Sequence, residues 1–173
     1  MKAAYITATG TPDAITVGNL PDPVAGPGEV VIRVSCSALN PIDLYIRAGT
    51  VPMTLPTPFI PGCDFAGVVE SVGAGVADLK PGDRVWGSNQ GLLGRQGTFA
   101  ELAAVDERWL YPTPDEVDDR TAAAGALVAA GRLRRRNSAP APSVIIAERR
   151  KPVMTTFCPS SWRIGSGISA SNS

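Results

Sequence analysis

Apolar and polar residues alternate most clearly over residues 30–38, and this two-residue period is that of a β-strand. We predict that the buried face of this strand carries Val30, Ile32, Val34 and Cys36. A second strand is predicted over residues 65–72, with one face formed by Phe65, Gly67, Val69 and Ser71. Further short runs predict strands over residues 2–7, 15–20 and 98–105. The pattern therefore predicts a mainly β domain.

Turn residues join two of these strands into a hairpin-like unit. The sequence Lys80-Pro81-Gly82-Asp83 fits a type II turn, because proline fixes a negative φ at the first central position and glycine accepts the positive φ at the second. Residues 84–86 then return as a strand. Residues 58–87 are therefore predicted to form a hairpin with a wide connection.

Two helices interrupt the β pattern. Asn40-Pro41-Ile42-Asp43 has the chemistry of a helix start, because Asn is a common N-cap, Pro suits the first helical position and Asp suits the first turn. Gly49 is predicted to end this helix. A second, Ala-rich helix is predicted from Asp118 or Asp119 to about Ala130.

The charges divide the chain into two parts. Residues 1–130 contain 8 Lys and Arg against 15 Asp and Glu, whereas residues 131–173 contain 8 against 1. The second part has little to bury and is rich in Ser, Ala and Gly, so we expect a disordered basic tail over residues 131–173. We interpret this tail as an out-of-frame or alternatively spliced ending. Its arginines favour a solvated charge run over a nucleic-acid or anionic-membrane patch, because no aromatic platform accompanies them.

The composition limits the catalytic and metal-binding chemistry that the chain can perform. The chain has no histidine, so the commonest general base and metal ligand is missing. Its three cysteines lie far apart and predict neither a disulfide framework nor a zinc ribbon, so each is expected to be a buried apolar residue or a free thiol. No apolar run approaches the length of a membrane span, and a cytoplasmic location without membrane association is expected.

Five ordered segments carry a resemblance to a known superfamily. They are residues 27–34 (PGEVVIRV), 36–49 (CSALNPIDLYIRAG), the segment 58–72, the turn with its return strand, and residues 97–101 (GTFAE). Together they make residues 1–130 resemble the medium-chain dehydrogenases/reductases, whose catalytic domain is a barrel similar to the GroES co-chaperonin. The resemblance implies a GroES-like, partly open β-barrel with short helices, which is an alcohol dehydrogenase-like N-terminal domain.

The superfamily divides into zinc-dependent alcohol dehydrogenases and zinc-free reductases. Where the zinc type has a Gly-His-Glu triplet, this chain has Gly62-Cys63-Asp64. A catalytic zinc needs three protein ligands, which Cys36, Cys63 and Asp64 could supply in principle. Core packing of both thiols is the simpler interpretation, so we expect no metal, and a zinc-type alcohol dehydrogenase relative remains the alternative.

The zinc-free branch is the better match. Residues 40–49 resemble the helix of NADPH:quinone oxidoreductases, which implies that Asn40 and Tyr45 contact the cofactor NADPH and that Ile42, Asp43 and Arg47 belong to the substrate cleft. The substrate implied is a small quinone or enone, reduced by a hydride from the nicotinamide. Without the resemblance, Asn40 would be only a cap, Tyr45 a core aromatic, and Asp43 with Arg47 an exposed ion pair.

A dinucleotide-binding domain is not predicted anywhere in the sequence. The fingerprint G-x-G-x-x-G must follow a strand and open a helix, whereas Gly73-Ala74-Gly75 lies in a hairpin connection. We therefore expect the 173-residue chain to be a truncated form without turnover of its own. The sequence leaves two alternatives open: that the chain is a non-enzymatic GroES-like interaction module, and that it forms a homo-oligomer.

Overall fold

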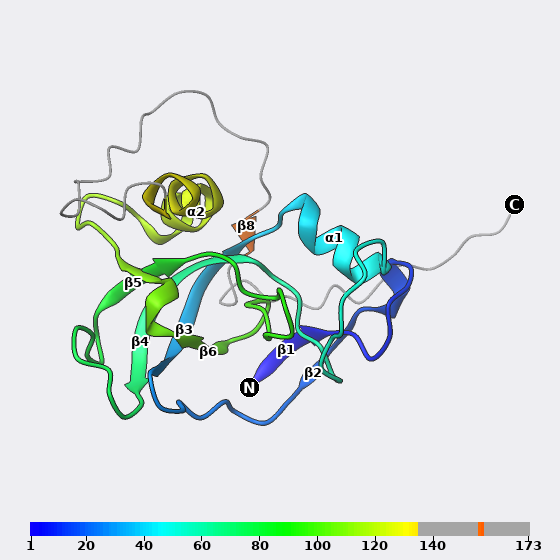
Figure 1. Cartoon of the computed structure of the whole chain (residues 1–173), viewed down its shortest axis with the longest axis horizontal. Coiled ribbons are helices and arrows are strands. Elements are labelled where there is room, and N and C mark those ends of the chain that lie inside the picture. The colour runs from blue at the N-terminus through cyan, green and yellow to red at the C-terminus, as the bar shows by residue number, and fades with distance from the viewer. Residues whose placement is uncertain (135–155, 158–173) are drawn as a thin grey trace, which may run out of the picture.

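The computed structural model describes residues 1–134 and 156–157 (Figure 1). Most of the segment for which we expect a disordered tail, residues 131–173, therefore lies outside the described residues. Only residues 131–134 and 156–157 of that segment are described. Residues 131–134 continue the second helix, and residues 156–157 form a strand. The helix thus extends beyond the predicted boundary at residue 130.

Antiparallel strands form two sheets. The small sheet pairs β1 (Lys2–Tyr5) with β2 (Thr16–Asn19). The large sheet has the order β6-β3-β4-β5-β7, and β8 also pairs with β3. Its strands are β3 (Glu29–Ala38), β4 (Asp64–Val72), β5 (Arg84–Gly87), β6 (Leu102–Asp106), β7 (Leu110–Pro112) and β8 (Thr156–Phe157). The sheets do not close on themselves, so the predicted mainly β, partly open barrel is confirmed.

Two α-helices and two 3-10 turns complete the described part of the fold. Helix α1 (Pro41–Ala48) follows β3, and helix α2 (Asp119–Arg134) lies over one face of the sheet against β3, β4 and β5 (Figure 1). The 3-10 turns are η1 (Pro12–Ala14) and η2 (Glu107–Trp109). Every strand pairing between described residues is antiparallel, so these residues contain no parallel βαβ unit of a dinucleotide-binding fold.

The predicted hairpin between β4 and β5 is confirmed. Gly82 has a φ of 94°, and the amide of Asp83 donates to the carbonyl of Lys80 at 3.1 Å, as a type II turn requires. The two strands pair from Phe65 opposite Gly87 to Val68 opposite Arg84. Turn chemistry alone was therefore enough to locate this connection.

The predicted faces of β3 are correct for only part of the strand. Val30, Ile32 and Val34 lie in one core cluster with Phe65 and Val69, as predicted. Cys36 instead packs in a second cluster, with Ala66, Trp86 and the small residues of α2. A register shift between Val34 and Cys36 explains this, because a β-bulge inserts one residue and moves the following side chains to the other face.

Two further expectations for the strands are wrong in detail. Val31, which by alternation lies on the face of β3 opposite to Val30 and Ile32, is nevertheless buried, so this strand is covered on both faces at that point. The strand predicted over residues 98–105 begins only at Leu102. Before it, the carbonyl of Phe99 accepts from the amide of Ala4, so this segment runs alongside β1.

Close packing between β3 and β4 depends on one glycine. A Cβ atom at Gly67 would lie 2.2 Å from the carbonyl oxygen of Arg33 and 2.9 Å from a methyl group of Ile32. Neither the backbone nor a buried side chain can yield that much without shifting the strand. Glycine at position 67 therefore allows the two central strands to pack this closely.

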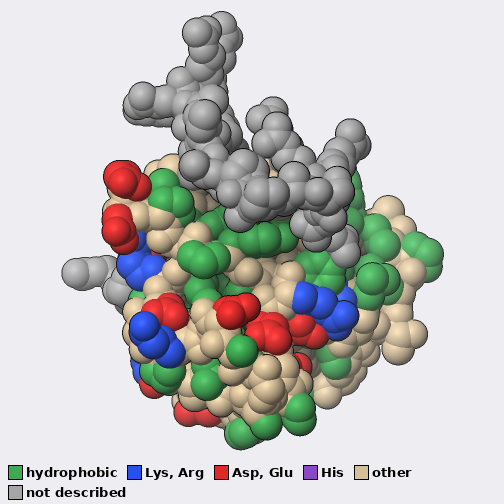
Figure 2. Space-filling model, turned by 60° about the vertical axis from the view of Figure 1, so that its left-hand side comes forward, with side chains coloured by type: hydrophobic (Ala, Val, Ile, Leu, Met, Phe, Trp, Pro, Cys, Tyr) green, Lys and Arg blue, Asp and Glu red, His purple; other side chains and the backbone are tan. Residues whose placement is uncertain are grey.

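The surface mixes charged and apolar side chains. On the face shown in Figure 2, acidic and basic side chains are interspersed with apolar ones. No helix within the described residues is long and apolar enough to cross a membrane.

Candidate functional site

Helix α1 begins at the end of β3, next to the start of β4. Asn40 is its N-cap and Pro41 its first residue, and Gly49 ends it in the left-handed conformation with a φ of 77°. The helix bounds predicted from the sequence are therefore confirmed. Several buried polar side chains of the fold meet at this junction, among them Asn40, Asp43 and Asp64.

Asn40 is held at this junction by its carboxamide nitrogen. Nδ2 donates to a carboxylate oxygen of Asp64 at 3.0 Å and lies 3.4 Å from the carbonyl oxygen of Ala38. The side-chain oxygen Oδ1 stands near the first turn of α1 but makes no hydrogen bond to any residue described. The predicted N-cap is present as a capping box, in which the Asn40 side chain faces the amide of Asp43 and the Asp43 carboxylate accepts from the amide of Asn40. The amide of Asp43 nevertheless donates to the main-chain oxygen of Asn40, so Oδ1 itself makes no hydrogen bond of full geometry.

Asp43 lies in the first turn of α1, on the buried side of the helix, with 4% of its surface exposed. Its carboxylate accepts from the amide of Asn40 at 2.7 Å, and the amides of Gly62 and Cys63 also stabilise its charge. Burial nevertheless dominates and raises the pKa of Asp43 from 3.8 to about 7. Asp43 therefore makes local main-chain contacts, and the described residues do not contain an ion pair between it and Arg47.

Asp64 is the centre of the buried polar network and is fully buried. One carboxylate oxygen accepts from the hydroxyl of Ser88, and the other accepts from Asn40 and, at 3.1 Å, from the amide of Leu127 in α2. Burial raises the pKa of Asp64, while the bonds from Ser88 and Asn40 oppose that rise. The sequence interpretation considered Asp64 only as a zinc ligand and missed this network, although an aspartate at the start of an apolar strand was a signal for it.

The other three predicted site residues lie apart from this network. Tyr45 is 52% exposed on the outer side of α1, so it is not a core aromatic residue. Ile42 packs against the core cluster around Ile6, Ile46 and Phe59. The guanidinium of Arg47 donates to the carbonyl oxygen of Gly10, and thereby ties α1 to the loop after β1.

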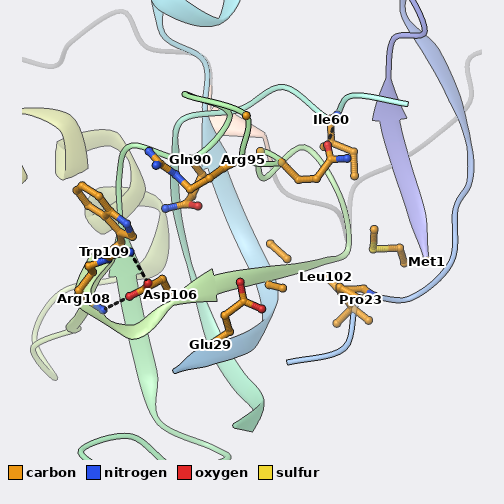
Figure 3. A pocket seen from close by; sticks show the side chains of 15 residues that line it. Met1, Pro23, Glu29, Ile60, Gln90, Arg95, Leu102, Asp106, Arg108 and Trp109 are labelled. Atoms are coloured by element: carbon orange, nitrogen blue, oxygen red, sulfur yellow. Dashed lines mark hydrogen bonds and ion pairs between the residues drawn. The ribbon is translucent and has the colours of Figure 1, made fainter. Parts of the chain in front are cut away.

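A pocket of about 430 Å³ lies elsewhere, beside β6 (Figure 3). Its wall includes Gln90, Leu102 and Trp109, and the guanidinium of Arg95 lies 5.1 Å from the centre of the Trp109 ring. The five residues predicted from the sequence do not line this pocket. It therefore does not identify the predicted site.

The three candidate zinc ligands are not brought together. Cys36 is disulfide-bonded and packs towards α2, so the expectation of a free or merely buried thiol is wrong for it. Cys63 is a free, buried thiol beside Ser88, and burial raises its pKa to about 12. Within the described residues, no three His, Cys, Asp or Glu side chains are grouped to hold a metal ion.

Comparison with known proteins places the chain in a family. The alcohol dehydrogenase GroES-like domain profile matches residues 26–115. The quinone oxidoreductase of Rattus norvegicus is 34% identical over 125 residues, which are 72% of this chain and 37% of that protein. The chloroplastic NADPH-dependent alkenal/one oxidoreductase of Arabidopsis thaliana is 39% identical over 129 residues, which are 71% of this chain and 33% of that protein.

A solved structure gives the same result for the fold. A mycobacterial protein, determined in complex with NADPH, superposes with a TM-score of 0.67 and 30% identity, covering 82% of this chain and 41% of that one. The chain thus spans well under half the length of the relatives that it matches. Because the family profile covers more than half of the 173 residues, the chain belongs to the alcohol dehydrogenase GroES-like domain family of the medium-chain dehydrogenase/reductase superfamily.

Proposed function

We propose that this chain is the substrate-side part of an NADPH-dependent oxidoreductase that reduces a small quinone or enone. The main support is the likeness to a quinone oxidoreductase and to an alkenal/one oxidoreductase, together with the domain-family match over residues 26–115, a range that includes Asn40 and Tyr45. When bound, the nicotinamide supplies the hydride, so the protein's task is to orient the two reactants and exclude water. That division of labour suits a chain without histidine.

One buried oxygen of the structure, Oδ1 of Asn40, has the chemistry to accept a hydrogen bond from a nicotinamide carboxamide. Asn40 Oδ1 is a buried acceptor without a hydrogen bond among the described residues, and leaving such an atom unpaired costs about 1–3 kcal/mol. The carboxamide of nicotinamide offers an N–H donor of the kind that this oxygen lacks. We propose that Asn40 accepts from that group when the cofactor is bound.

The other four residues predicted from the sequence have supporting roles in this proposal: they contact the ligands or hold helix α1 in place. Tyr45, half exposed on α1, would contact the cofactor or the acceptor through its ring or hydroxyl. Asp43 and Arg47 hold the helix by their bonds to the main chain at its two ends, and Ile42 packs it onto the core. In this proposal they form the base of the substrate cleft.

The 173-residue chain itself is proposed to have no turnover. Asn40 is only 1% exposed, so a ligand donor reaches its oxygen only after neighbouring atoms move. The described residues also offer no βαβ unit to bind the rest of a dinucleotide. Weak cofactor binding and no measurable reduction are therefore expected from this chain on its own.

The test is NADPH-dependent reduction of a quinone and of an enone by residues 1–130 fused to a nucleotide-binding domain of the superfamily. Asn40→Ala should lower kcat/KM by roughly tenfold or more, since one hydrogen bond that orients the nicotinamide through its carboxamide is lost. Asn19→Ala is the matched control, because Asn19 is exposed in the small sheet. A fusion that binds NADPH but reduces neither acceptor would contradict the proposal.

A further inference from the structure

The orientation of the Asn40 carboxamide is determined by its neighbours. Its nitrogen faces two acceptors, the Asp64 carboxylate at 3.0 Å and the Ala38 carbonyl at 3.4 Å. A flipped amide would turn its oxygen toward both, and the pairing with Asp64 would be lost. Asp64 therefore decides which of the two polar atoms of Asn40 stays unpaired.

Asp64 is itself held from three sides. Its donors come from α1 (the N-cap Asn40), from the residue after β5 (Ser88) and from α2 (the Leu127 amide). Its own main chain belongs to β4, paired with Ala38 of β3. A carboxylate bonded to three elements and fully buried cannot rotate freely, so it can fix the side chain next to it.

We infer that Asp64 is a positioning residue: it holds Nδ2 of Asn40 so that Oδ1 remains the acceptor for a donor group of the ligand. This inference rests on the proposed function, which supplies the nicotinamide carboxamide as that donor. Asp64 itself does not contact the ligand. Its role is to keep Asn40 from presenting a nitrogen donor where an oxygen acceptor is needed.

The chemistry of the site provides a conservative variant and a disruptive one. In Asp64→Asn, the new amide oxygen can face Asn40 and Leu127, which only donate, while its nitrogen faces Ser88, whose hydroxyl can also accept. Asp64→Asn should therefore keep Asn40 in place without the negative charge. Asp64→Ala removes the acceptor, and Ser88→Ala removes a donor without touching Asn40.

The experiment is nitrogen-15 NMR of the side-chain amides of the full chain, with Asn40 assigned from Asn40→Ala. We expect two well-separated Asn40 amide protons in the wild type and in the Asp64→Asn and Ser88→Ala variants. Their exchange with solvent should be about tenfold or more slower than for exposed Asn19, as expected for one hydrogen bond. In Asp64→Ala this protection should be lost.

Titration with NADPH of residues 1–130 fused to a nucleotide-binding domain, followed by the same Asn40 signals, separates this inference from the proposed function. An NADPH-dependent shift of the Asn40 amide that survives in Asp64→Asn and disappears in Asp64→Ala supports both. An ordered Asn40 amide that never responds to NADPH in this fusion overturns the proposed function but leaves Asp64 as the group that fixes Asn40. If the side-chain amide protons of Asn40 in the wild type exchange with solvent as fast as those of Asn19, the positioning role is refuted. This outcome needs only the wild-type chain, so it decides the question whether or not Asp64→Ala folds.

Discussion

The buried carboxyl of Asp43 should make the stability of this domain fall as the pH rises from about 4 to about 7. Its pKa is raised by burial from 3.8 to about 7, so the folded state binds the proton more tightly than the unfolded chain does. The stabilisation is fully present below the unfolded pKa and is lost as the pH passes the folded pKa. Three pKa units correspond to about 4 kcal/mol of unfolding free energy.

Urea unfolding at half-unit steps between pH 4 and pH 8 measures this dependence. Asp43→Asn should remove most of it, because the amide carries no charge at any pH in that range. The pKa of Asp64 is raised as well, so a smaller slope of the same sign should remain. The reasoning is refuted if wild-type stability rises over this window, or if Asp43→Asn keeps the full slope.

Three further predictions concern packing and reactivity. Gly67→Ala should destabilise the domain by about 3 kcal/mol or more in urea unfolding, because the added Cβ would lie 2.2 Å from the carbonyl oxygen of Arg33. Gly125→Ala is the control: its Cβ would have no atom within 4 Å, and it should stabilise α2 by up to about 1 kcal/mol. Cys63 should resist alkylation at pH 8 by on the order of a hundredfold relative to the chain in urea, as peptide mass spectrometry would show, since burial raises its pKa to about 12. Arg47→Ala should cost about 1–2 kcal/mol of unfolding free energy, because a guanidinium bond to the loop after β1 is lost, and an unchanged urea midpoint would contradict that contact.

Local sequence chemistry was enough to predict the parts of the fold that depend on neighbouring residues. The turn at Gly82 and the stop of α1 at Gly49 both need a positive φ, which glycine adopts without strain. Pro41 and the acidic Asp43 identify the start of α1 in the same way. These features require no knowledge of the rest of the chain.

Features that depend on distant pairing were not predictable. Alternation gives the faces of a strand only while the register is regular, so the bulge before Cys36 reversed the assignment of that residue. The partners of Asp64 are Asn40, Ser88 and Leu127, which lie 24, 24 and 63 residues away in the sequence. A buried polar network of this kind becomes visible only when the sheet and both helices are in place.

The central claim is that Asn40 and Tyr45 belong to a nicotinamide site that needs a further nucleotide-binding domain. Its most direct test is titration of NADPH, followed by nicotinamide fluorescence, against the 173-residue chain and against residues 1–130 fused to such a domain. We predict binding by the fusion that is weakened by Asn40→Ala, and no saturable binding by the chain alone. Saturable binding by the chain alone, or a fusion whose affinity is unchanged by Asn40→Ala, would contradict the account.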